Sequence, residues 1–317
     1  MRMTACSLMV KLCAAGLLMV CGGCFTGVEG TKKIELSRQE VRRSEPTAED
    51  RLISEVSAQK AEDWRRGKEF LVTDNRAALM FDSRTLPANP INLNLAGKTL
   101  RFTGFSNQKT AAGEEEKIIV FTDGKRQYLY PTGSTSGNGK ALPQSDEMPM
   151  MVDKEMIDRM NTLLQGRTLW TRTQLWYDSS GKVKHGKKYI PVTVDSVTAG
   201  DNAFPLKIWF TGKEDNSDSK GSMYITIGAT RANSRPFGSQ FALADMRRDY
   251  PDIEDSVWTL IQEGKIKEGM TKEECRLSLG SPRDVVQGHN TGNLYDIWQY
   301  SDGLYLIFQD GVLIRNK

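Results

Sequence analysis

Short apolar runs, divided by turn dipeptides, dominate the sequence between residues 68 and 225. Three of the predicted turns are Asp123-Gly124, Ser180-Gly181 and Lys220-Gly221. Residues 68–73 and 77–81 are predicted as two further strands around a turn at Asp74-Asn75. Runs of this length with Gly-containing turns predict antiparallel strands joined by hairpins, because a helix needs a longer periodic stretch. This part of the chain is therefore predicted to be mostly β.

An internal repeat suggests that the β region consists of two related units. The repeated segments are residues 95–100 (LAGKTL) with 164–169 (LQGRTL), and 119–125 (IVFTDGK) with 208–213 (IWFTGK). We interpret residues 47–150 and 151–250 as two small units of the SH3-like or sandwich kind. The alternative is chance recurrence, because a Gly followed by a Thr-Leu strand is common.

Two helices are predicted within these units. Residues 47–66 have a weak apolar stripe, and Thr47 with Asp50 approximates a capping box at its start. A second helix is predicted after Asp153, which can cap it, and Gly166 can end it. Its apolar face contains Met156, Ile157, Met160, Leu163 and Leu164.

Residues 251–317 predict a separate α+β unit. One helix begins at Ser256 and ends at Gly264, and a capping box of Thr271 with Glu274 begins another, which Gly280 ends. After a polar loop, three strands joined by two Asp-Gly turns are predicted at residues 297–300, 304–308 and 312–314. The result is a helix–helix–three-stranded antiparallel sheet with both helices on one face.

This last unit resembles the SmpA/OmlA (BamE-like) family of small outer-membrane lipoproteins. The matching motifs are Gly269-Met270-Thr271, Leu279-Gly280-Ser281-Pro282, Trp298-Gln299-Tyr300 and Phe308-Gln309-Asp310-Gly311-Val312-Leu313. The resemblance implies a role in assembling β-barrel proteins in the outer membrane. The same fold occurs in secreted proteins that inhibit β-lactamases, so it leaves function open. The motif residues are turn, cap and core residues, and we assign none of them to binding.

The N-terminus predicts export. Arg2 and Lys11 precede an apolar run that is too short to span a bilayer, which needs about 20 residues. The run ends in Gly22-Gly23-Cys24, which resembles the lipobox of bacterial lipoproteins. We expect a signal peptide at residues 1–23, lipidation of Cys24 and a flexible polar tether at 24–46. An ordinary cleaved signal with a chance Cys is the alternative.

Charge and composition narrow the function classes. The formal charge of +3 becomes +1 when Arg2 and Lys11 are removed with the leader. A near-neutral chain argues against nucleic-acid binding, which needs a basic footprint. No segment after residue 24 is long and apolar enough to be a transmembrane helix. We expect a lipid-anchored outer-membrane protein that faces the periplasm, because no acidic run follows Cys24.

No catalytic or metal-binding constellation is apparent in the sequence. The two His, His185 in a charged hairpin and His289 in a Gly/Asn loop, have no partner at metal-ligand or triad spacing. Residues 215–221 lack the ligand order of a calcium loop and predict a solvated hairpin. Cys275 is predicted to be a buried apolar residue. We therefore expect no enzymatic activity, no metal and no cofactor.

The remaining hypothesis is binding of a protein partner in the envelope, as an accessory or scaffold subunit in outer-membrane protein assembly. The alternative is a module that recognises a secreted enzyme or a glycan. Weak candidates for binding residues are Trp170, Trp176, Tyr177, Lys184 and Lys187. Aromatic and basic side chains suit such contacts, but we expect at least two of the three aromatic residues to be buried in a β core, and a solvated hairpin is the favoured alternative for the basic ones.

Overall fold

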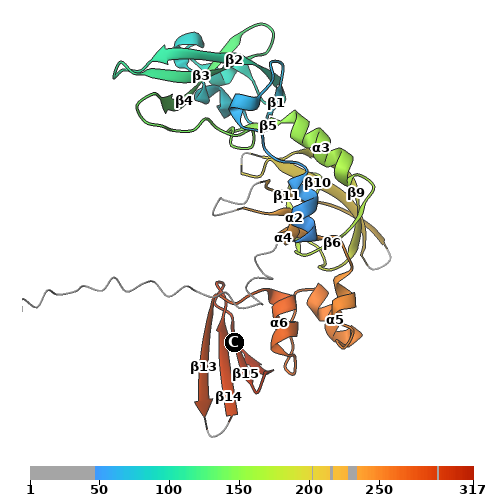
Figure 1. Ribbon diagram of the computed structural model, residues 1–317. Helices are drawn as coiled ribbons and strands as arrows, with labels where there is room; N and C mark the ends of the chain where they lie inside the picture. Colours follow the sequence, from blue (N-terminus) through green and yellow to red (C-terminus); the bar gives the residue numbers. More distant parts are fainter. Residues whose placement is uncertain (1–46, 202, 215–216, 228–233, 291–292) are drawn as a thin grey trace, which may run out of the picture. The chain divides into compact units, whose positions relative to one another are not determined.

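The computed structural model describes residues 47–317, apart from residues 202, 215–216, 228–233 and 291–292 (Figure 1). Three antiparallel sheets with a few short helices make up this part of the chain, which confirms the α+β, mostly β prediction. The predicted signal peptide, Cys24 and the tether all lie outside the described residues.

The first sheet has five strands in the order β4-β3-β2-β1-β5. The strands are β1 (Glu69–Val72), β2 (Thr99–Lys109), β3 (Glu115–Thr122), β4 (Gln127–Thr135) and β5 (Met151–Asp153). Its core is aromatic: Trp64, Phe70 and Phe121 are buried and their rings contact one another. Because β5 pairs with β1, the first sheet extends to Asp153, which is three residues past the predicted unit boundary at residue 150.

Two predictions in this region are wrong. Residues 77–81 are not a strand, because η2 (Asn75–Met80) is a 3-10 helix whose start is fixed by the Asp74 side chain accepting from the Arg76 N–H. The helix predicted at 47–66 is shorter and consists of α2 (Ala48–Ser54), followed by η1 (Ala61–Asp63). The predicted capping box at the start of α2 is confirmed. Two further 3-10 turns, η3 (Ser83–Thr85) and η4 (Pro90–Leu93), precede β2.

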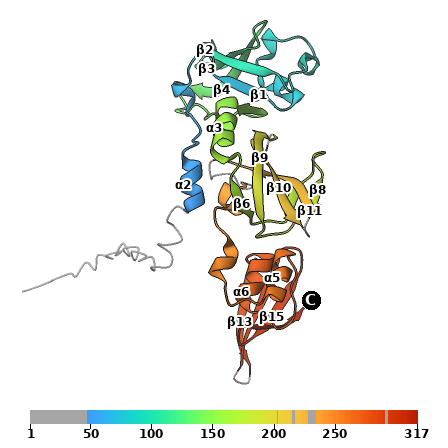
Figure 2. The same cartoon turned by 90° about the vertical axis from the view of Figure 1, so that its right-hand side faces the viewer.

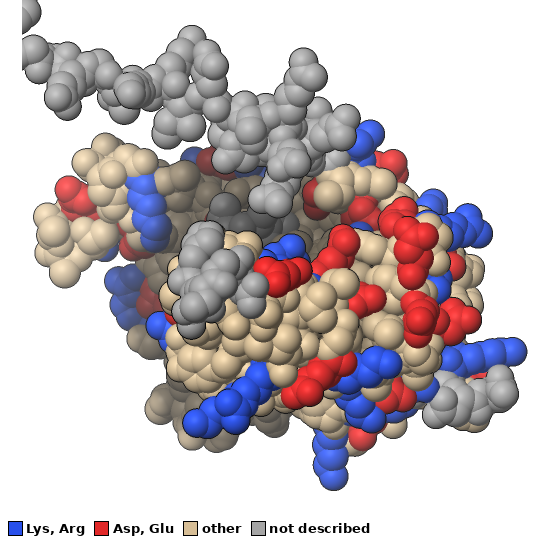
Figure 3. All heavy atoms as spheres, turned by 90° about the horizontal axis from the view of Figure 1, so that it is seen from below, with Lys and Arg blue, Asp and Glu red and all other residues tan. Residues whose placement is uncertain are grey.

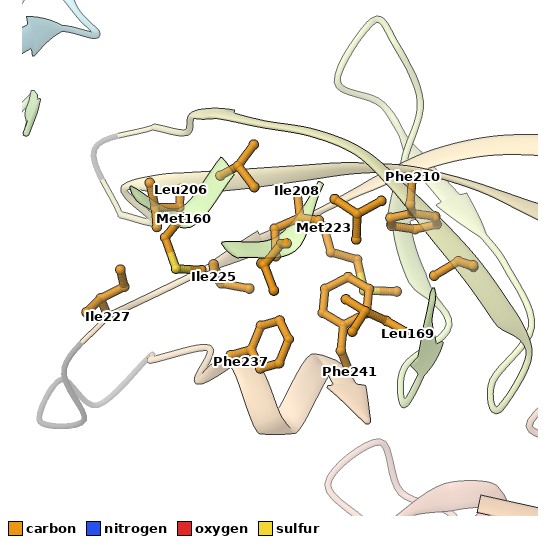
Figure 4. Packing of buried hydrophobic residues seen from close by; sticks show 14 of the residues in the cluster. Met160, Leu169, Leu206, Ile208, Phe210, Met223, Ile225, Ile227, Phe237 and Phe241 are labelled. Carbon is orange, nitrogen blue, oxygen red and sulfur yellow. The ribbon is translucent and has the colours of Figure 1, made fainter. Parts of the chain in front are cut away.

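The second sheet has seven strands in the order β12-β6-β9-β10-β11-β7-β8. The strands are β6 (Thr168–Thr171), β7 (Leu175–Tyr177), β8 (Val183–His185), β9 (Pro191–Ala199), β10 (Leu206–Glu214), β11 (Ser217–Ile225) and β12 (Phe241–Ala242). Figure 4 shows the core side chains of β10 and β11 meeting Phe237 of α4 (Phe237–Gln240) and Phe241 of β12. A 3-10 turn, η5 (Met246–Asp249), follows β12.

The helix α3 (Lys154–Leu164) connects the two sheets in the sequence and confirms the prediction made from its apolar stripe. The Asp153 side chain accepts from the N–H of Glu155, and the buried face contains Met156, Met160 and Leu164. Gly166 follows the helix with a φ of 77°, a left-handed conformation that costs glycine little.

The glycine turns of the two repeated sequence segments have the same backbone geometry, but they precede strands at different positions in their sheets. The N–H groups of Gly97 and Gly166 donate to Val72 and Val194 carbonyls at 2.8 and 2.9 Å, and both glycines have positive φ. However, Gly97 precedes β2 whereas Gly166 precedes β6, which occupies the sheet position of β1. The counterpart of Gly166 by position is Gly67, whose N–H donates to the Phe102 carbonyl at 2.7 Å. The strand orders β4-β3-β2-β1-β5 and β11-β10-β9-β6-β12 correspond throughout.

The predicted turn at Lys220-Gly221 is wrong, since both residues lie inside β11 opposite Thr211 and Phe210. The glycine is there for a different reason. A Cβ on Gly221 would lie 2.9 Å from the Trp176 ring and 3.1 Å from the Phe210 ring. Only a residue without a side chain lets the two rings approach the strand so closely.

The third sheet has four strands in the order β13-β14-β15-β16. The strands are β13 (Asp284–Asn290), β14 (Asn293–Gln299), β15 (Tyr305–Gln309) and β16 (Val312–Asn316). The last three confirm the predicted strands, but β13 replaces the predicted loop that contained His289. Seven residues of β13 pair in register with β14, and its Val285-Val286 pair favours a strand.

Two helices, α5 (Asp255–Gln262) and α6 (Lys272–Leu279), lie on one face of this sheet, as predicted (Figure 2). The capping box of Thr271 with Glu274 is confirmed. The helices and the sheet share one buried cluster that includes Trp258 and Ile261 from α5, Cys275 from α6, and Trp298 and Phe308 from the strands.

Candidate binding surfaces

The predicted binding residue Trp176 is a core residue. Its side chain is fully buried, and its ring meets the Phe210 ring edge-on at 4.9 Å between centroids. The indole N–H donates to the Thr173 carbonyl at 3.1 Å, so the polar atom is satisfied inside the protein. Trp176 therefore has no surface left with which to bind a ligand.

The other four predicted residues do not form one surface. Lys184 is half-buried, with its Nζ 5.4 Å from the Trp176 ring centroid and in contact with Ser219. Lys187 is also half-buried and interacts within the protein. Trp170 lies in β6 opposite Ala242 of β12, at the other end of the sheet order. Tyr177 alone belongs to a larger cluster.

That cluster lies on the outer face of the second sheet, opposite the core. We call it the aromatic face and define it as Tyr177, Phe204, Lys207, Trp209, Tyr224 and Arg235. Along β10, Ile208 and Phe210 are fully buried on the core side, whereas Lys207 and Trp209 alternate with them on the other side. Lys207 lies directly opposite Tyr224 in the register of β10 with β11.

Rings and cations alternate across the aromatic face. The Lys207 Nζ lies 4.1 Å from the Trp209 ring centroid and 5.0 Å from that of Tyr224. The Arg235 guanidinium lies 4.1 Å from the Phe204 centroid and donates to the Tyr177 hydroxyl at 3.0 Å. Such cation–π pairs contribute about 0.5–2 kcal/mol each, depending on desolvation.

Lys207 is unusual in its electrostatic environment. Only 8% of the residue is exposed, and burial lowers its pKa, while Asp178 and Asp201 raise it from a distance. Among the residues that the structure describes, no carboxylate forms an ion pair with Lys207. Asp178 accepts instead from the N–H and hydroxyl of Ser180, and Asp201 from the N–H groups of Ala203 and Phe204. Burying a cation without an anionic partner costs free energy, so an anionic group of a ligand would be attracted to such a site.

The third sheet presents a different kind of surface. On the face away from the helices, Val286, Ile297 and Ile307 form one cross-strand row. Val286 is 61% exposed and Ile297 38% exposed. Val285 lies opposite Trp298, on the other side of the sheet, and is 49% exposed. β13 is also the end strand of its sheet, so no described strand pairs with its outer edge. This surface combines exposed aliphatic side chains with an open backbone edge.

A polar cavity of about 580 Å³ lies beside β1 and α3, and several of its charged side chains form ion pairs with neighbouring residues. The buried Lys68 amine contacts the carboxylates of Asp153 at 2.7 Å and Glu155 at 3.1 Å. Glu69 accepts from Lys154 at 2.6 Å and from Arg101 at 2.9 Å, and these bonds lower its pKa. Because these paired cations and anions neutralise one another, this group of side chains has a structural explanation.

Another cavity, of about 400 Å³, lies beside α2 and α4. Its apolar wall contains Ile53, Val56 and Phe237, which also belong to the core of the second sheet or pack against it. Asp50 lines it too, but one of its carboxylate oxygens already accepts from the N–H and hydroxyl of Thr47 in the capping box. The apolar wall is thus explained as an extension of the core.

Two kinds of reactive group can be assessed in the described part of the chain: grouped metal ligands and the thiol of Cys275. Across residues 47–317, with the gaps given above, no three His, Cys, Asp or Glu side chains are grouped so that they could hold a metal ion. Cys275 is fully buried, and burial raises the pKa of its thiol to about 12, so a reactive thiolate does not form at neutral pH.

Charges of both signs are interspersed on the face of the molecule shown in Figure 3. That face has no extended region of a single sign, which accords with the small net charge. None of the described helices has the length and apolar character needed to cross a bilayer. No protein-family model matches the sequence, and no curated protein matches it either.

Proposed function

We propose that this protein is a bacterial lipoprotein, anchored to the outer membrane through Cys24, that acts by protein–protein binding in the periplasm. The leader sequence supports export and the Gly22-Gly23-Cys24 motif supports the anchor. The C-terminal resemblance supports a BamE-like unit, and with it an accessory or scaffold role in outer-membrane protein assembly. We further propose that the first two units are of the SH3-like or sandwich kind.

The observation that carries the binding proposal is the free edge of β13. An edge strand has a row of backbone N–H and C=O groups that face outward, and an extended segment of a partner can add to it as a further strand. Val285 and Val286 flank this edge with exposed apolar side chains, which a partner strand would cover. Unfolded barrel strands are segments of this kind, so the edge suits a role in barrel assembly.

Capture from detergent-solubilised membranes tests the proposal. The full chain carries a C-terminal affinity tag, and bound proteins are identified and quantified by mass spectrometry. Val286→Lys places a charge at the edge, where lysine discourages strand addition, and we expect it to reduce capture of the partner by roughly tenfold. Val183→Lys is the matched control, because Val183 is 56% exposed on the end strand β8 of the second sheet.

The two classes of partner give different results. Recovery of the barrel-assembly machinery by the unmodified chain and by Val183→Lys, with loss in Val286→Lys, supports the proposal. Recovery of a soluble secreted enzyme in its place supports the inhibitor-like alternative. Equal capture by Val286→Lys and the unmodified chain would show that the β13 edge is not the binding surface.

The anchor is tested separately, by mass spectrometry of the mature N-terminus. We expect Cys24 to be the first residue and to carry a diacylglyceryl thioether and an N-acyl chain, and Cys24→Ala to release the protein from the membrane fraction. An unmodified N-terminus beyond residue 24 would contradict lipidation, without affecting the proposal for β13.

A further inference from the structure

The aromatic face of the second sheet has the elements of a ligand site that is independent of β13. Trp209 and Tyr224 are half-buried, so part of each ring remains accessible on the outer side of the sheet. The Trp209 indole N–H donates to the Thr198 hydroxyl at 3.0 Å, which fixes the orientation of the ring. A ring held in place before binding loses little conformational entropy when a ligand stacks on it.

Hydroxyl and carboxylate groups border these rings. Thr198 is exposed next to Trp209, and the Thr211 hydroxyl donates to Asp195 at 2.9 Å on the same face of β9 and β10. A flat apolar ring bordered by hydrogen-bonding groups matches a pyranose, which has C–H bonds on its faces and hydroxyls around its edge. The surface is therefore better suited to a saccharide than to an aliphatic protein segment.

The buried amine of Lys207 favours a ligand that carries a negative charge. Its amine lies within 5.0 Å of the centroids of both the Trp209 and the Tyr224 ring. The residue is mostly buried, and the amine has no ion-pair partner among the described residues. The aromatic rings offset part of the cost of burying the charge, but they do not neutralise it. An anionic group on the ligand would neutralise this charge next to the rings on which the sugar stacks.

We propose that the aromatic face binds an acidic saccharide, meaning one that carries a carboxylate or a phosphate group. The sugar ring stacks on Trp209 and Tyr224, and the anionic group pairs with Lys207. Arg235, held by Phe204 and Tyr177, extends the positive side of the same site.

Isothermal titration calorimetry of the full chain in detergent tests this proposal. The probes are tri-galacturonate with the neutral maltotriose as its control, and glucose 6-phosphate with glucose as its control. We expect at least one acidic probe to bind roughly tenfold or more tightly than its neutral control. The preferred pair identifies the anion as a carboxylate or a phosphate. Inorganic phosphate alone is a fifth probe and should bind more weakly, because it cannot stack.

Three variants test the two parts of the site separately, namely the charge of Lys207 and the stacking surface of Trp209. Lys207→Met keeps the length of the side chain but removes the charge, and we expect it to abolish the preference for the acidic probe. Trp209→Leu should weaken acidic and neutral probes alike, whereas Trp209→Phe, which keeps a ring, should restore part of the binding. Lys213→Met is the control, because Lys213 is an exposed cation on the same strand outside the cluster.

The proposal is overturned if none of the sugars binds at 10 mM, roughly the weak limit of specific recognition. It is also overturned if phosphate alone binds as tightly as the acidic sugars, or if Lys213→Met lowers affinity as much as Lys207→Met does. Circular dichroism of each variant excludes unfolding as the cause of a loss, and Trp209→Phe tests the stacking if Trp209→Leu fails to fold.

Discussion

The second and third sheets both bury one face and leave the other open, but their open faces differ in chemistry and in position. On the second sheet, the aromatic face spans the inner strands β10 and β11 and combines rings with cations. On the third sheet, the exposed Val286–Ile297–Ile307 row is aliphatic and reaches the end strand β13. An inner strand offers only side chains to a ligand, whereas an end strand also offers its backbone. This difference is why we assign a small ligand to one face and a protein segment to the other.

The largest expected effect comes from Gly221 in the second sheet, and Gly288 in the third sheet is its matched comparison. Gly221→Ala in β11 places a Cβ 2.9 Å from the Trp176 ring, and we expect a loss of about 2–3 kcal/mol in the stability of the second sheet. Gly288→Ala in β13 has nothing within 4 Å of the new Cβ and should be nearly neutral. Hydrogen exchange of peptides from residues 206–225 and 284–309 measures the two effects separately. Equal protection losses in both variants would contradict the packing described around Gly221.

A smaller effect is expected at the buried ion pair of the third sheet. Asp296 of β14 contacts the Lys272 amine and accepts from the Gln287 amide at 2.7 Å. Burial raises the pKa of Asp296, but the bonds from Lys272 and Gln287 lower it more, so the net pKa is below its usual value. We expect Asp296→Asn to destabilise this unit by about 2 kcal/mol at pH 7, measured by urea unfolding.

The same ion pair predicts a response to acid. Because the folded-state pKa of Asp296 is lowered, its stabilisation is fully present above the unfolded value of about 3.9 and is lost as the pH falls through the folded-state value. Urea midpoints of the third unit should therefore fall between about pH 5 and pH 2. The slope should be shallower in Asp296→Asn, and an unchanged slope would exclude Asp296 as its source.

The smallest effect is expected on the second sheet, at alkaline pH. Burial lowers the pKa of Lys207, so the folded state releases its proton more readily than the unfolded state does. Stability should rise with pH between the folded-state value and the unfolded value of about 10.4. Lys207→Met removes this rise and leaves the acid response of the third sheet intact. A rise that persists in Lys207→Met would show that another group produces it.

Local signals in the sequence predicted the element boundaries that depend on caps and tight turns. Both capping boxes, the cap at Asp153 and the Asp302-Gly303 turn form as predicted, because each depends on residues a few positions apart. β13 was missed because most of its residues are polar or glycine, and its strand conformation depends on pairing with β14. Tertiary pairing of this kind leaves no local periodicity.

The candidate sites were harder to predict than the fold. Trp176 and Tyr177 are adjacent and point to opposite faces of one strand, so the sequence alone could not separate the core residue from the surface residue. The alternation of Lys207 and Trp209 with Ile208 and Phe210 was a usable signal. Arg235 and Phe204 join the aromatic face from segments outside β10 and β11, and only the folded chain brings them there.

The pairing of β1 with β5 has a consequence for the order of folding events. The β2-β3-β4 hairpins join neighbouring segments, whereas Phe70 pairs with Asp153 across some eighty intervening residues. Closing so long a loop costs more chain entropy than closing a hairpin, so the meander is expected to form before the sheet is completed. On a chain that emerges N-terminus first, β1 can pair with β2 early, but its pairing with β5 must wait until residues 151–153 are synthesised. That strand also brings the Asp153 carboxylate that neutralises Lys68.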